Sequence, residues 1–175
     1  MVIIITGATH CGKTLAAQRL LERLKYPYLS IDHLKMGLIR SKNTALSVED
    51  DKGLTEYLWP IVAEMIKTVI ENGQNIIIEG CYVPFDWRNS FSEEYLPQIK
   101  LVCLAMSANY IETNFENIKT HSSDIEKRLD GSDFTCERLK NDNRFYIDGF
   151  RGAGENVCII NENYEKTLDE ILNNF

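Results

Sequence analysis

Residues 7–14 read GATHCGKT, and only Thr6 separates this stretch from an apolar run with the sequence MVIII at residues 1–5. The β-branched segment 2–6 is typical of a short buried strand. Gly7 and Gly12 allow a tight backbone turn that other residues resist, and apolar residues recur at helical spacing from residue 13 onward. The sequence therefore predicts a strand, a glycine-rich loop and a helix in immediate succession.

This loop has the residues that phosphate binding requires. Gly7-x-x-x-x-Gly12-Lys13-Thr14 fits the P-loop (Walker A) pattern, in which backbone N–H groups and the positive end of the following helix point at one anion. In such a loop Lys13 bridges the β- and γ-phosphates of ATP, and the Thr14 hydroxyl ligates Mg²⁺. We expect His10 and Cys11 to contribute their backbone N–H groups only. The predicted cofactors are ATP and Mg²⁺, and the predicted binding residues are Gly7, Ala8, Thr9, His10, Cys11, Gly12, Lys13 and Thr14.

Strand-like and helix-like segments alternate along the rest of the chain. The strand candidates are 2–6, 27–31, 75–79, 100–104 and 157–160, and the main helix candidates are 13–25, 54–71, 137–148 and 164–173. This alternation predicts an α/β fold with a parallel sheet covered on both faces. Asn72-Gly73 should close the second helix, and Pro60 should kink it or make it start afresh at Trp59. A length of 175 residues is typical of a single domain spanning 1–175.

Composition excludes several classes of function. The net charge of −7 argues against a nucleic acid or an anionic membrane as partner, because such partners select basic surfaces. No stretch approaches the roughly 20 apolar residues of a membrane span, and the apolar start lacks the basic segment of a secretory leader. The five cysteines lack C-x-x-C spacing, which is typical of reduced thiols. We therefore expect a cytoplasmic protein, a monomer or homodimer, whose partners are ATP and a small molecule.

Two carboxylates follow predicted strands at the edge where α/β folds bind ligands. Asp32 ends the segment YLSID, and a short amphipathic helix follows it. It is placed to orient and deprotonate an acceptor hydroxyl, or simply to cap that helix. Glu79 ends the segment NIIIE before Gly80. It could hold Mg²⁺ through water, orient the acceptor, replace Asp32 as base, or serve only as a structural carboxylate.

Three arginines are candidates for contacts with phosphates or with the acceptor. Arg40 and Arg88 could each clamp an anionic acceptor, or be ordinary surface charges. The polar segment 119–136 is predicted to form a lid that excludes water, with Arg128 as the cation that stabilises the moving phosphate. A second polar segment, 41–53, is expected to cover the surface near the acceptor-binding region, about residues 32–60.

Together these residues resemble the small P-loop kinases of the nucleoside monophosphate kinase fold. The stretch 30–38 (SIDHLKMGL), with Leu58-Trp59-Pro60 and Ile78-Glu79-Gly80, looks most like bacterial 2-phosphoglycerate kinase-like and adenylate-kinase-like proteins. The resemblance implies a three-layer fold with a five-stranded parallel sheet in the order 2-3-1-4-5. It also implies an acceptor site after the second strand and a lid before the last helices. The D-G-[FY]-P-R stretch of true adenylate kinases is absent, since residues 79–84 read EGCYVP, which argues against AMP as acceptor.

The sequence is compatible with three functions. The first is an ATP-dependent kinase, a P-loop phosphotransferase, that acts on a hydroxyl of a small, anionic, 2-phosphoglycerate-like metabolite. In that reading the catalytic residues are Lys13, Asp32 and Arg128, the acceptor is bound by Asp32, Arg40, Glu79 and Arg88, and the metal by Thr14 and Glu79. The alternatives are a nucleoside monophosphate kinase, which needs no base, and a nucleotide-sensing module that binds ATP without an acceptor.

Overall fold

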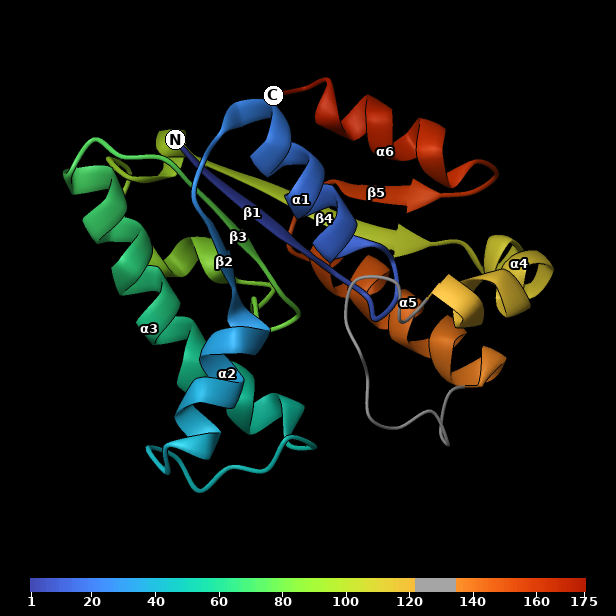
Figure 1. Ribbon diagram of the computed structural model, residues 1–175, viewed down its shortest axis with the longest axis horizontal. Coiled ribbons are helices and arrows are strands. Elements are labelled where there is room, and N and C mark those ends of the chain that lie inside the picture. The colour runs from blue at the N-terminus through green and yellow to red at the C-terminus, as the bar shows by residue number, and fades with distance from the viewer. Residues whose placement is uncertain (122–134) are drawn as a thin grey trace.

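The computed structural model describes residues 1–121 and 135–175. In these residues five strands form one fully parallel sheet with the order β2-β3-β1-β4-β5, as expected (Figure 1). The strands are β1 (Val2–Gly7), β2 (Tyr28–Ser30), β3 (Ile76–Glu79), β4 (Ile99–Met106) and β5 (Val157–Ile160). The helices are α1 (Lys13–Leu24), α2 (Ile31–Arg40), α3 (Asp51–Glu71), α4 (Ala108–His121), α5 (Cys136–Gly152) and α6 (Tyr164–Leu172), with 3₁₀ turns at Trp87–Ser90 and Leu96–Gln98.

Helices cover both faces of the sheet because its central strand is apolar on both sides. Along β1, Val2 and Ile4 pack into the cluster formed with α3 and the second half of α5. The alternate residues Ile3 and Ile5 pack into the cluster formed with α1 and α6. Successive side chains of a strand point to opposite faces, so the continuous apolar run at residues 2–5 requires a layer of helices on each side. The result is the three-layer α/β fold.

Helix α3 runs from Asp51 to Glu71 without interruption and contains Pro60. The interpretation that a new helix starts at Trp59 is therefore wrong. Pro60 is exposed, so the carbonyl that loses its helical N–H partner lies on the solvent side. Meanwhile Leu58, Val62 and other apolar residues of α3 are buried against the sheet and hold both halves of the helix in place. The helix ends as predicted, with Gly73 at φ +65°.

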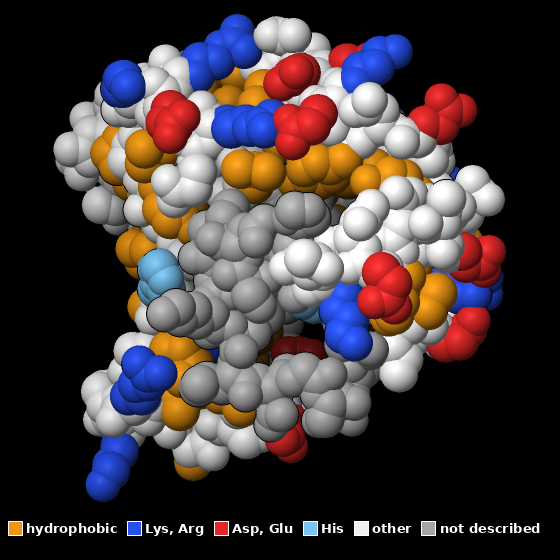
Figure 2. All heavy atoms as spheres, turned by 45° about the vertical axis from the view of Figure 1, so that its right-hand side comes forward, with side chains coloured by type: hydrophobic (Ala, Val, Ile, Leu, Met, Phe, Trp, Pro, Cys, Tyr) orange, Lys and Arg blue, Asp and Glu red, His pale blue; other side chains and the backbone are white. Residues whose placement is uncertain are grey.

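The surface in Figure 2 shows acidic and basic side chains intermingled on the face in view, without a basic patch. Among the described residues, the helices are too short or too polar for any of them to cross a bilayer.

The carboxyl ends of β1, β2 and β3 meet at one edge of the sheet, where the register pairs Ile5 with Glu79 and Ser30 with Glu79. Here the chain leaves β1 through Gly7, at φ +133°, and runs close against β4. A Cβ atom on Gly7 would lie 1.9 Å from the carbonyl oxygen of Leu104, so a side chain has no room. The next N–H, that of Ala8, donates a hydrogen bond to the same oxygen at 3.1 Å.

Candidate functional site

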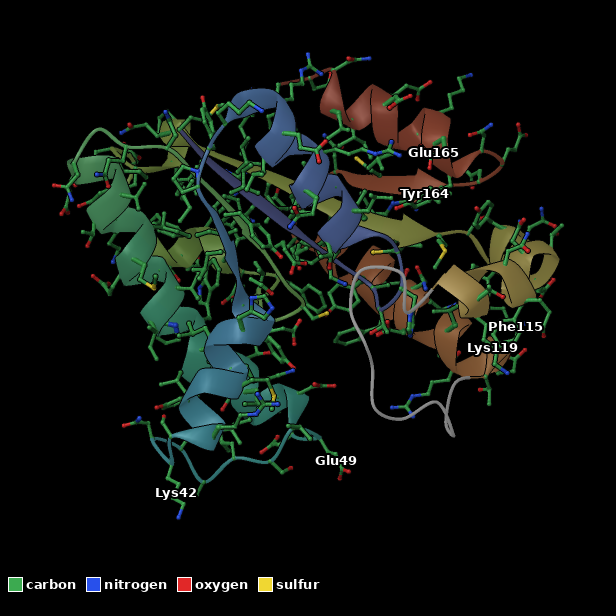
Figure 3. All side chains as sticks on the ribbon, viewed as in Figure 1. Lys42, Glu49, Phe115, Lys119, Tyr164 and Glu165 are labelled. Carbon is green, nitrogen blue, oxygen red and sulfur yellow. The ribbon has the colours of Figure 1, made fainter. Side chains whose placement is uncertain are left out.

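The loop 7–14 wraps around the start of α1. His10 and Gly12 have left-handed φ values of +62° and +83°, and the Gly12 carbonyl accepts the first helical hydrogen bond, from the Ala16 N–H. A Cβ atom on Gly12 would lie 1.7 Å from the hydroxyl of Tyr164, which is labelled at the start of α6 in Figure 3. Glycine is thus required at residue 12 by the backbone conformation and by the tyrosine that lies over it.

Lys13 is almost completely buried at the base of this loop. Its Nζ donates a hydrogen bond to the carbonyl oxygen of Ala8 at 2.8 Å. Burial by itself lowers the pKa of Lys13, but the acidic groups around it, including the thiol of Cys81 and the carboxylate of Glu79, raise the pKa above its ordinary value. Lys13 is therefore a fixed positive charge at neutral pH, held inside the loop where an anion would bind.

Glu79 lies at the end of β3 and is 1% exposed. Its Oε1 accepts hydrogen bonds from the hydroxyls of Ser30, at 2.9 Å, and Tyr28, at 3.1 Å. Burial raises the pKa of Glu79, against the opposing effect of Lys13 and of these hydroxyls. Both hydroxyls belong to residues of β2. Glu79 thus joins β2 to β3 and places a negative charge near Lys13.

Asp32 lies in the first turn of α2, but it does not cap that helix. Ser30 is the N-terminal cap residue, and no side chain caps the helix. Instead the Asp32 carboxylate pairs with the Lys35 ammonium at 2.5 Å. Lys35 also donates to the Tyr82 hydroxyl at 2.9 Å, and that hydroxyl donates to Asp51 Oδ1 at 3.4 Å. We call these four residues, Asp32, Lys35, Tyr82 and Asp51, the Lys35 network.

The Lys35 network and the phosphate-binding loop lie at the same edge of the sheet, where β1, β2 and β3 end. Burial is the main cause of the raised pKa values of Glu79 and Cys81. Both groups also respond to Lys13, which lowers their pKa, and to Asp32, which raises it. Only charges that lie near a group affect its pKa in this way. In the sheet, β3 lies between β2 and β1, so Asp32, which follows β2, and Lys13, which follows β1, lie on either side of the end of β3.

Sequence reasoning missed three further residues of this site. Lys35 was recoverable, since residues three apart on a helix share a face and it follows Asp32 by three. Asp51 and Asp142 carried no such signal. Asp142 in α5 accepts a hydrogen bond at 2.6 Å from the N–H of Thr9 in the loop, 133 residues away in the chain.

In the described part of the chain, neither Arg40 nor Arg88 makes a hydrogen bond or ion pair with Asp32, Glu79 or the loop. Arg40 is exposed at the last turn of α2. Arg88 makes an ion pair with Glu155, at 2.5 Å and 3.2 Å, and the same carboxylate accepts a hydrogen bond from the indole of Trp87. Arg128, with residues 122–134 of the predicted lid, lies outside the described residues.

The residues that are present fit a bound nucleotide and its metal ion. The buried cation Lys13 lies at the base of the loop, and Thr14 lies in the first turn of α1. Among the described residues, no three His, Cys, Asp or Glu side chains come together to hold a metal ion by themselves. Protein-bound Mg²⁺ commonly takes one or two protein ligands and completes its shell with phosphates and water. Thr14, and Glu79 through water, would serve as those ligands.

Similar solved structures identify the fold. The shikimate kinase from Acinetobacter baumannii in complex with shikimate superposes with a TM-score of 0.58 at 17% identity, covering 99% of this chain and 93% of that one. A sugar kinase from Janibacter gives 0.55 at 15% identity over 98% and 92%, and the shikimate kinase from Aquifex aeolicus gives 0.52 at 18% over 99% and 95%. This chain has the fold of the small P-loop kinases. No protein-family model and no curated protein matches its sequence.

Proposed function

We propose that this protein is an ATP- and Mg²⁺-dependent kinase that transfers the γ-phosphoryl group to a hydroxyl of a small molecule. The observation that carries the proposal is that Asp32, just after β2, and the buried cation Lys13, just after β1, lie on either side of the end of β3. The fold supports it, since the similar structures named above are a sugar kinase and two shikimate kinases. Because the sequence identity to these structures is 15–18%, the acceptor has to be inferred from this chain's own side chains.

The nucleotide half of the reaction belongs to the loop. Its N–H groups and Lys13 bind the β- and γ-phosphates, and their positive charge stabilises the negative charge on the moving group. Mg²⁺, when bound, neutralises phosphate charge and polarises the γ-phosphorus for attack. Thr14 and, through water, Glu79 hold it. By resemblance we assign Arg128 the role of the cation that closes over the phosphates.

Asp32 acts as the general base for the acceptor. The acceptor hydroxyl gives its proton to the Asp32 carboxylate as its oxygen forms a bond to the γ-phosphorus. The bond from that phosphorus to the β,γ-bridging oxygen breaks, and ADP leaves. A base is useful here because an alcohol has a pKa far above 7, and general-base assistance contributes about 10²–10⁴-fold. The ion pair with Lys35 fixes the orientation of the Asp32 carboxylate before the acceptor arrives.

The resemblance to 2-phosphoglycerate kinase-like proteins implies an anionic acceptor clamped by Arg40 and Arg88. The described side chains lend this finer assignment little support, because Arg88 is bound to Glu155 and Arg40 is exposed.

The experiment is a measurement of acceptor-dependent ADP release across a panel of hydroxylated metabolites and nucleoside monophosphates. Lys13→Ala should abolish turnover, whereas Lys52→Ala, which removes an exposed lysine of α3, should retain it. Wild-type turnover in Lys13→Ala would contradict the kinase proposal. So would tight ATP binding without acceptor-dependent ADP release for any compound in the panel, which would favour a nucleotide-sensing module.

A further inference from the structure

We propose that the acceptor is an uncharged or amine-bearing polyhydroxy compound and not a phosphorylated or carboxylated one. This inference rests on the proposed kinase function and names the substrate class of the same site. It follows from the balance of charge around Asp32, where the described residues of the Lys35 network comprise two carboxylates and one ammonium group.

The one cation of the Lys35 network is already paired. The Lys35 side chain is 12% exposed, and its ammonium contacts both the Asp32 carboxylate and the Tyr82 hydroxyl. An anionic acceptor that took Lys35 for itself would leave Asp32 as a partly buried carboxylate without its counter-ion, which is strongly unfavourable. An acceptor without negative charge leaves that ion pair intact.

A second carboxylate increases the imbalance. Tyr82 is 4% exposed, and its hydroxyl proton is directed to Asp51 Oδ1. Burial raises the pKa of Tyr82 to about 12, so this hydroxyl keeps its proton at neutral pH. The network therefore combines two carboxylates, Asp32 and Asp51, with the single positive charge of Lys35. Carboxylate oxygens accept hydrogen bonds from hydroxyl or ammonium groups and repel anions.

Two other described cations, Lys13 and Arg88, are engaged elsewhere. Lys13 is required for the nucleotide phosphates, and Arg88 is paired with Glu155. Figure 3 shows Lys42 at the outer end of the α2–α3 unit, away from the sheet edge. On the loop side the carboxylates of Glu79 and Asp142 add further negative charge close to the site. An acceptor that approaches Asp32 thus meets a field that favours neutral or positive groups.

The test uses acceptor sets matched in skeleton and different in charge. The three-carbon set is glycerol, 3-amino-1,2-propanediol, glycerate and 2-phosphoglycerate, and the six-carbon set is glucose, glucosamine, glucuronate and glucose 6-phosphate. ATP-dependent phosphorylation is measured for each by phosphorus NMR and ADP release. We expect kcat/KM for the best neutral or amine-bearing compound to exceed that of its anionic counterparts by about tenfold or more.

A charge variant tests the cause of that preference. Asp51→Asn removes one negative charge and keeps an oxygen that can accept the Tyr82 hydrogen bond. It should raise KM for amine-bearing acceptors several-fold more than KM for neutral ones. It should also reduce the ratio of kcat/KM between neutral and anionic acceptors. Glu49→Gln is the matched control, because it removes one charge from the exposed segment just before α3 without touching the network. It should change none of these ratios.

The outcomes separate the two proposals. Preferred phosphorylation of glycerate, 2-phosphoglycerate, glucuronate or glucose 6-phosphate would overturn the inference and leave the kinase function standing. Equal effects of Asp51→Asn on acceptors of all charges would also overturn it. Failure to phosphorylate any compound in this set or the broader panel, in a protein that binds ATP, would contradict the kinase proposal itself.

Discussion

The carboxylate of Asp142 accepts a hydrogen bond from the backbone N–H of Thr9 at 2.6 Å. The donor belongs to the phosphate-binding loop, and the acceptor belongs to α5, 133 residues later in the chain. An acidic side chain thus accepts the hydrogen bond of one of the loop's N–H groups. Phosphates that enter the loop come close to this negative charge, so its removal should be visible in nucleotide affinity.

We predict that Asp142→Asn binds ATP and ADP more tightly than the wild type. The amide oxygen of asparagine can still accept the Thr9 hydrogen bond, so the loop keeps its shape while the charge repulsion disappears. The expected gain approaches tenfold in Kd, which corresponds to roughly 1.4 kcal/mol. Isothermal titration calorimetry measures it, with Asp148→Asn, an exposed change on the same helix, as control. Weaker binding in Asp142→Asn would show that the carboxylate organises the loop instead of competing with phosphate.

Gly12→Ala should destroy nucleotide binding and lower stability. The left-handed φ of +83° costs an L-residue roughly 1–2 kcal/mol, and the new Cβ would lie 1.7 Å from the Tyr164 hydroxyl. Tyr164→Phe in the same chain should recover only part of the loss, because the backbone strain remains. Titration with a fluorescent ATP analogue and thermal unfolding provide the measurements. Gly152→Ala, where nothing lies within 4 Å of the added Cβ, should bind nucleotide normally.

Asp32→Asn should lower kcat by about 10²–10⁴-fold with any hydroxyl acceptor, because the amide cannot take the proton. Stability should fall, because the substitution removes the counter-ion of Lys35, whose side chain is 12% exposed. The value of kcat is therefore measured at a temperature where thermal unfolding shows both proteins to be folded. A kcat within about fivefold of wild type, well below the general-base range, would exclude Asp32 as the base and direct attention to Glu79 or to a phosphate acceptor. His33→Asn, an exposed change next to Asp32 in α2, serves as the control.

Glu79→Gln should stabilise the nucleotide-free protein at neutral pH and have little effect at pH 4. Burial raises the pKa of Glu79 in the folded state, so the folded protein binds more protons than the unfolded chain between the two pKa values. Wild-type stability therefore falls as pH rises through that window, whereas glutamine does not titrate. Urea unfolding at several pH values without Mg²⁺ measures the difference. If the difference between Glu79→Gln and wild type did not grow with pH, Glu79 would be ionised in the fold without cost. Glu93→Gln, on the exposed surface, is the control.

Much of the fold and the phosphate-binding loop followed from the sequence because their causes are local. The apolar run before Gly7 requires burial on both faces wherever the strand lies, and Gly12 permits a conformation that few other residues adopt. The end of α3 at Asn72-Gly73 is equally local. The strand order came from the resemblance, since periodicity shows that strands exist and not which of them are neighbours.

Only the tertiary structure decided how the charges pair. Asp51 reaches Tyr82 across 31 residues and Asp142 reaches Thr9 across 133, and no spacing rule links residues so far apart. From the sequence, Arg88 could bind an anionic acceptor or be an ordinary surface charge. In the fold it makes an ion pair with Glu155. A proline inside a helix usually interrupts it. Helix α3 nevertheless continues through Pro60, because its apolar face packs against the sheet on both sides of that residue. A carboxylate or an arginine acquires its role from the charges that folding brings near it, and those contacts form between segments that the sequence keeps apart.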